Sequence, residues 1–190
     1  VALTVNPAIP DLREPSALLV SDDAQRVAWN LSYDRDPVQF DFRKRALEAG
    51  APGRGLSAAR TSAGFFSRNR WQNVPDPVVS GKPILMEAGE LSRALANFAT
   101  GGDTMLATSR HLMRIDASGA VRWRVRLGVE ARAVVVAADD RVVVTGMADG
   151  SLRWWQAENG KTLLTLLATR DGKWIAWTPE GYFDASTGAD

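Results

Sequence analysis

The chain has 190 residues, with 23 Lys and Arg against 22 Asp and Glu, and no cysteine. A net charge of +1 gives little attraction to polyanions, so we expect neither nucleic acid nor a membrane as a partner. Without cysteine the chain has no disulfide, thiol nucleophile or thiolate metal site, and the compartment stays open, with the cytoplasm slightly favoured.

The first part of the chain contains four short strand-like runs. They lie at residues 17–21, 26–31, 38–42 and 45–49. Together they predict four antiparallel strands. A basic turn, Arg43-Lys44-Arg45, lies before the last run. It is either a contact for a partner or a solvated hairpin tip, and the hairpin tip is the favoured interpretation.

Residues 50–91 are irregular. The segment 50–64 is small, polar and rich in glycine, so we expect a long loop. It leads to residues 65–71 and, past two prolines, to a strand at residues 83–87. Trp71, flanked by Arg68 and Arg70, is the best candidate among the tryptophans for an exposed aromatic side chain in a cationic partner surface.

Residues 92–130 again contain four strand-like runs. They lie at residues 93–100, 104–109, 111–116 and 120–125. Residues 92–100 also permit a short helix capped by Ser92, because Leu95, Ala96 and Ala99 allow a helical face. The register of the repeat favours a strand.

Residues 131–169 form the most complete unit. Strand-like runs lie at residues 134–136, 142–145, 152–156 and 163–167. Asp149-Gly150 is the dipeptide that best supplies the positive-φ pair of a two-residue hairpin between the second and third runs. Asn159-Gly160 supplies the next turn.

Residues 170–190 predict only a hairpin, in which the turn Thr-Pro-Glu-Gly at residues 178–181 joins two strands. We interpret it as an incomplete fifth unit with an open edge that needs a partner strand. Residues 1–5, VALTV, alternate as an edge strand does and are one candidate. A second copy, or the rest of a longer parent protein, is the other.

Turn clusters recur along the chain at intervals of about 40 residues. The repeat predicts an all-β, propeller-like array of four-stranded antiparallel blades, with about four and a half units in one domain. The expected unit boundaries are 15–49, 50–91, 92–130, 131–169 and 170–190.

The segment ADGSLRWWQAENGKTL resembles the WD-repeat pattern, and Asp149, Ser151 and Trp155 fall on its positions. The resemblance implies a buried hydrogen-bond network of Thr145, Asp149 and Trp155. The family's Gly-His pair has no counterpart, and Gln156 replaces its final Asp, so a weakened network is expected. KWIAWTPEGYFDAS looks like the C-terminal propeller part of bacterial WD-repeat proteins, some of which carry a caspase-like or other effector domain.

No motif for catalysis, a cofactor or a metal is recognisable. His111 is the only histidine, and no G-x-S-x-G elbow, calcium loop or Walker motif occurs. Six of the seven tryptophans lie in strand-like runs, where packing explains them.

We therefore expect a non-catalytic interaction or sensing module that binds a protein partner or another domain of its parent chain. Homo-oligomers that cover open blade edges are a further expectation. The alternative is an enzyme, or a small-ligand or carbohydrate binder, with a site at the central channel.

Overall fold

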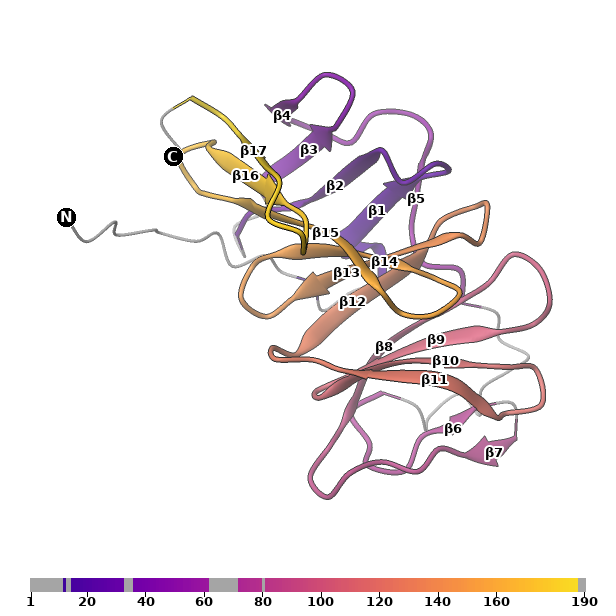
Figure 1. The fold of residues 1–190 in the computed structure, drawn as a ribbon. Helices are drawn as coiled ribbons and strands as arrows, with labels where there is room; N and C mark the ends of the chain where they lie inside the picture. The colour runs from indigo at the N-terminus through magenta and orange to yellow at the C-terminus, as the bar shows by residue number, and fades with distance from the viewer. Residues whose placement is uncertain (1–11, 13–14, 33–35, 62–71, 80, 188–190) are drawn as a thin grey trace.

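The computed structural model describes residues 12, 15–32, 36–61, 72–79 and 81–187 (Figure 1). In these residues the only helical element is a single 3-10 turn, Pro15–Ala17. No helix in the described ranges is long and apolar enough to cross a membrane. The strands β1 to β17 form antiparallel sheets, so the predicted all-β class is confirmed.

Sheet 1 is built from the first unit and one short strand of the second, with strand order β4-β3-β2-β1-β5. The strands are β1 (Leu18–Ser21), β2 (Arg26–Asn30), β3 (Pro37–Asp41), β4 (Ala46–Ala49) and β5 (Leu56–Ser57). Pro37 is the first residue of its strand, a position where the missing N–H of proline is tolerated.

Sheet 2 is built from the third unit, with strand order β11-β10-β9-β8. The strands are β8 (Ser92–Asn97), β9 (Thr104–Thr108), β10 (His111–Ile115) and β11 (Val121–Arg126). The helix considered for residues 92–100 does not form. Leu95 pairs with Leu106 of β9 instead, and both side chains are buried, so pairing and burial override the local helical option.

Sheet 3 is longer than expected, with the order β12-β13-β14-β15-β16-β17. The strands are β12 (Ala131–Val136), β13 (Val142–Met147), β14 (Leu152–Gln156), β15 (Thr162–Ala168), β16 (Trp174–Trp177) and β17 (Phe183–Ala185). The last hairpin, expected as the start of a fifth unit, thus extends the fourth. The turn after β15 is tight, because Thr169 N–H donates to Lys173 C=O and Gly172 has φ 79°, and it holds β16 against β15.

The second unit contributes little to the sheets. Its strands are β6 (Val78–Val79) and β7 (Lys82–Pro83), which form a small hairpin, while β5 joins sheet 1. The strand expected at residues 83–87 is wrong beyond Pro83. Ile84 N–H still donates to Pro77 C=O, but β6 begins at Val78, so among the described residues no strand remains for residues 85–87 to pair with. Residues 65–71 and the candidate closing strand at 1–5 lie outside the described residues.

Sheet 3 lies between sheets 1 and 2, with the small hairpin beyond sheet 2 (Figure 1). The first strands of the sheets, β1, β12 and β8, are neighbours, as the inner strands of propeller blades are. One apolar core joins sheets 1 and 3, a second joins sheets 3 and 2, and a third joins sheet 2 to the small hairpin. The described residues form a propeller-like array of antiparallel blades, and among them the first and last blades do not meet to close a ring.

Two adjacent tryptophans take part in different cores. Trp154 packs in the core shared with sheet 1, and Trp155 packs in the core shared with sheet 2. Neighbouring residues of a strand point to opposite faces, so each face of sheet 3 receives one indole. Both are buried, as the alternation predicts.

Candidate functional site

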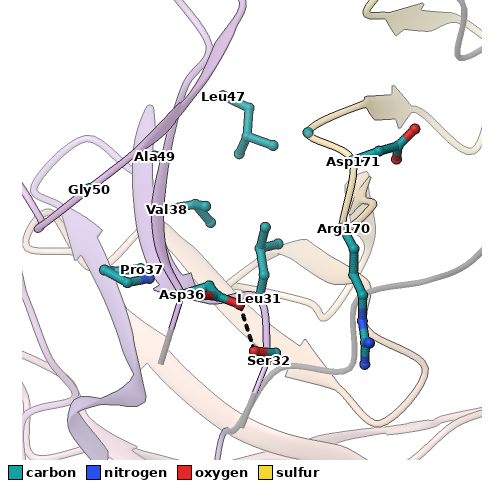
Figure 2. A pocket seen from close by; sticks show the side chains of 11 residues that line it. Leu31, Ser32, Asp36, Pro37, Val38, Leu47, Ala49, Gly50, Arg170 and Asp171 are labelled. Carbon is teal, nitrogen blue, oxygen red and sulfur yellow. Dashed lines mark hydrogen bonds between the residues drawn. The ribbon is translucent and has the colours of Figure 1, made fainter. Parts of the chain in front are cut away.

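A pocket lies between sheet 1 and the turn that joins β15 to β16, with a volume of about 600 Å³ (Figure 2). Its lining residues are Leu31, Ser32, Asp36, Pro37, Val38, Leu47, Ala49, Gly50, Arg170, Asp171 and Gly172. Figure 2 shows Leu31, Val38 and Leu47 on one side of the pocket and the turn residues on the other. The end of sheet 1 therefore supplies an apolar wall, and the turn supplies charged groups.

The carboxylates of this pocket already have partners. Ser32 Oγ donates to Asp36 Oδ2 at 2.8 Å, and the hydroxyl of Thr169 donates to Asp171. The bond from Thr169 lowers the pKa of Asp171, so this carboxyl is anionic at neutral pH. Arg170, in contrast, has no side-chain hydrogen bond or ion pair with any described residue.

A second surface lies at the free end of sheet 3. We call Leu163, Trp177, Tyr182 and Phe183 the hairpin surface; the last two are 78% and 68% exposed. Trp177 and Phe183 are directly opposed in the ladder, so their side chains share one face of the sheet. The opposite face of β16 carries Trp174 and is covered by sheet 1. Trp177 and Phe183 thus lie on the side of the extended sheet that sheet 1 does not cover, whereas Tyr182, the preceding residue, lies toward the face of Trp174 and lines a pocket with it.

No described strand pairs with the outer edge of β17. Thr178 N–H donates to Tyr182 C=O, and Ser186 N–H donates to Trp174 C=O. In an antiparallel ladder such pairs alternate, so the N–H and C=O groups of Phe183 and Ala185 point away from β16. Beside this edge lies a small pocket of about 230 Å³. Its lining residues are Phe40, Phe42, Arg45, Leu164, Trp174, Ala176, Thr178, Tyr182, Phe183 and Asp184.

A buried polar cluster surrounds the single histidine. His111 Nδ1 lies 2.8 Å from Glu90 Oε1, and the hydroxyl of Thr108 donates to the same carboxylate. His111 Nε2 lies 3.6 Å from Glu87 Oε1 on the other side of the ring. Arg110 and Arg126 both bind Glu87. Sequence reasoning missed this cluster, because Glu90 and His111 are on different strands or loops and have no motif spacing.

The cluster has the residue types of a metal site, since Glu87, Glu90 and His111 offer ligand atoms within 4.8 Å of one another. Its electrostatics favour a structural role. Arg110 and Arg126 lie against Glu87, where they would repel a cation. The Thr108 hydroxyl and the His111 imidazole already form hydrogen bonds with the Glu90 carboxylate. Catalysis is not favoured either, because Thr108 Oγ1 also accepts hydrogen bonds from the backbone N–H groups of Arg110 and His111.

The WD-like network forms in part. Trp155 Nε1–H donates to Thr145 Oγ1 at 2.8 Å in a buried bond, and Thr145 also lies 3.3 Å from Met147 Sδ. Asp149 does not join it: its Oδ1 accepts from Ser151 Oγ at 2.6 Å instead. Among the described polar residues, no imidazole bridges Asp149 to Thr145, as expected from the missing Gly-His pair.

The hairpin at Asp149-Gly150 forms, but its turn differs from the expected one. Only Gly150 has positive φ, at 88°, and Gly150 N–H donates to Met147 C=O. Ser151 C=O accepts from Met147 N–H, so Ala148, Asp149 and Gly150 make a three-residue loop. A type I turn followed by a left-handed glycine is the common geometry of such loops.

The basic turn of sheet 1 is engaged within the chain. Arg43 pairs with Asp23, Lys44 with Glu48, and Arg45 with Asp184 of β17. The Arg45 pair links the two sheets at the small pocket. The other expected partner surface, Trp71 with Arg68 and Arg70, lies outside the described residues.

Comparisons with known proteins add little to this geometry. No protein-family model matches the chain, and no curated protein matches it. Among solved structures, the chain is similar to the β-propeller domain of Cps50 (Swd1) from Myceliophteria thermophila, at 10% sequence identity and a TM-score of 0.42. The match covers 92% of this chain and 86% of that one. A TM-score this low does not define a fold. The propeller-like class is therefore assigned from the strand order and the three cores.

Proposed function

We propose that the chain is a non-catalytic protein-interaction module whose hairpin surface and β17 edge bind a protein partner or another domain of a parent chain. The exposure of Tyr182 and Phe183, beside a strand edge that no described strand pairs with, carries the proposal. Large exposed apolar patches mark interaction sites, and an open edge offers backbone groups to an incoming strand. The resemblance of residues 173–186 to the C-terminal propeller part of bacterial WD-repeat proteins, some of which carry an effector domain, supports a place in a larger protein.

A photo-crosslinking amino acid at position 182 tests this proposal in cells that express the parent protein. Position 121 is the matched control, because Val121 is 39% exposed on the outer strand of sheet 2. We expect one specific adduct from position 182 and none from 121. An adduct of two copies of the chain identifies a homo-oligomer.

The partner identified in this way is then purified and titrated. The double variant Tyr182→Ser, Phe183→Ser should weaken binding at least tenfold without lowering the unfolding midpoint, since both side chains are exposed. Equal adducts from positions 182 and 121, or unchanged affinity in the double variant, would refute the proposal.

A further inference from the structure

The pocket between sheet 1 and the β15–β16 turn has the properties of a small-ligand site. It is separate from the hairpin surface proposed above as the partner site. Its volume of about 600 Å³ falls within the range of about 300–1,000 Å³ typical of such sites. Leu31, Val38 and Leu47 form an apolar wall (Figure 2). A few polar groups at the margin of an apolar cavity are the usual means of orienting a ligand.

The charged residues of the pocket determine the charge that the polar end of a ligand must have. Asp36 and Asp171 accept hydrogen bonds from Ser32 and Thr169, and Lys173 Nζ lies 3.7 Å from Asp171 Oδ2. Arg170 has no such partner among the described residues, and its guanidinium points away from Asp171 (Figure 2). An anionic group is therefore the complement that the pocket lacks.

A carboxylate fits this cation better than a phosphate. The planar guanidinium fork matches a carboxylate with two parallel hydrogen bonds. A phosphate dianion would need more than one cation, and it would face the two nearby carboxylates of Asp36 and Asp171. From these observations we infer that the pocket binds a molecule with a single carboxylate on an apolar body, with the carboxylate on Arg170 and the apolar body on Leu31, Val38 and Leu47.

Isothermal titration of the whole chain with decanoate, below its micellar concentration, tests the inference. We expect saturable binding of one molecule per chain. Arg170→Gln should weaken decanoate binding about tenfold, the usual effect of losing a charged hydrogen bond. Binding of decanol, which has no charge, should be the same in the variant and the natural chain.

Matched variants separate the pocket from general surface effects. Arg141→Gln removes another exposed arginine, on the turn between β12 and β13, and should leave the affinity for decanoate unchanged. Leu47→Ser should weaken decanoate and decanol alike, because Leu47 lines the apolar wall. N-acetyl-leucyl-leucine serves as a second carboxylate probe, and its affinity relative to decanoate distinguishes a peptide C-terminus from a free acid as the source. Absence of saturable binding by both carboxylates, or equal decanoate affinity in Arg170→Gln, would overturn the inference.

Discussion

At the scale of single residues, two hairpin glycines differ in what a side chain would meet. Gly160 and Gly172 both have positive φ, at 74° and 79°. A Cβ on Gly160 would lie 2.7 Å from Val125 Cγ2 and 2.9 Å from the ring of Trp123, whereas nothing lies within 4 Å of the same position on Gly172. Gly160 therefore permits the β14–β15 turn to approach sheet 2.

Replacement of these glycines by alanine should separate backbone strain from steric conflict. Gly172→Ala should lower the free energy of unfolding by about 1 kcal/mol, through the positive φ alone. Gly160→Ala should lower it by about 2–4 kcal/mol, because overpacking adds to the same strain. Urea unfolding of both variants measures the difference. Equal losses in the free energy of unfolding would show that the close contact of Gly160 with sheet 2 adds no cost to the substitution.

Glu90 is the second residue whose surroundings predict a measurable property. Burial raises the pKa of its carboxyl, but the hydroxyl of Thr108, the backbone N–H of Glu87 and the imidazole of His111 lower it more, and the pKa lies below its usual 4.5. A carboxyl with a lower pKa in the folded chain stabilises the fold above its unfolded pKa. This stabilisation is lost as the pH falls through the folded-state pKa.

The variant Glu90→Gln should therefore be less stable than the natural chain at pH 7, by about 1–3 kcal/mol. The difference between the two proteins should begin to shrink below a pH of about 4.5, where the carboxyl of the unfolded chain becomes protonated, and should shrink further as the pH falls through the lower pKa of the folded chain. Glu158→Gln, at an exposed position, is the control. Unfolding followed between pH 3 and pH 7 measures the effect, and a difference that does not vary with pH would contradict it.

At the scale of elements, β16 connects two surfaces of different character. Trp174 is buried against sheet 1, with its ring 4.8 Å from that of Phe40 in an edge-to-face contact. Trp177, on the same strand, is 37% exposed and belongs to the hairpin surface. The strand thus contributes one tryptophan to the core that joins sheets 1 and 3, and one to the proposed partner site.

Alanine substitutions on β16 should reflect this division. Trp174→Ala should cost about 3–5 kcal/mol, as removal of a large buried aromatic does. Trp177→Ala should cost about half as much or less, because part of its surface is already in water. Thermal or urea unfolding compares the two. A larger loss for Trp177→Ala would mean that the sheet faces are assigned the wrong way round.

At the scale of the whole molecule, sheet 3 shares one core with sheet 1 and another with sheet 2. No described sheet buries its apolar faces alone, so we expect the three sheets to unfold together. The far-ultraviolet circular dichroism should show β-structure with very little helix, and its urea transition should coincide with that of tryptophan fluorescence. Separate transitions would indicate independently stable blades, and a helical spectrum would contradict the fold.

Most strands of the first, third and fourth units were predictable from the sequence, because they depend on local signals. Alternating apolar residues define the strands, and Asp-Gly and Asn-Gly pairs mark the turns that join neighbours. The opposite orientations of Trp154 and Trp155 follow from the same local geometry. The type of the Asp149-Gly150 turn was missed, since the same dipeptide suits loops of two and three residues.

Other features depend on contacts between distant segments, and only the tertiary structure decided them. Nothing local indicates that β16 and β17 extend sheet 3 and pack on sheet 1, or that Arg170 faces Leu31 across a pocket. The cluster of Glu90 and His111 likewise forms only when β8 pairs with β9, which places Glu90 beside the turn between β9 and β10. The alternation of apolar residues along each strand determined which side chains face inward. Which neighbouring blade each sheet face packs against depended on the packing of the whole chain.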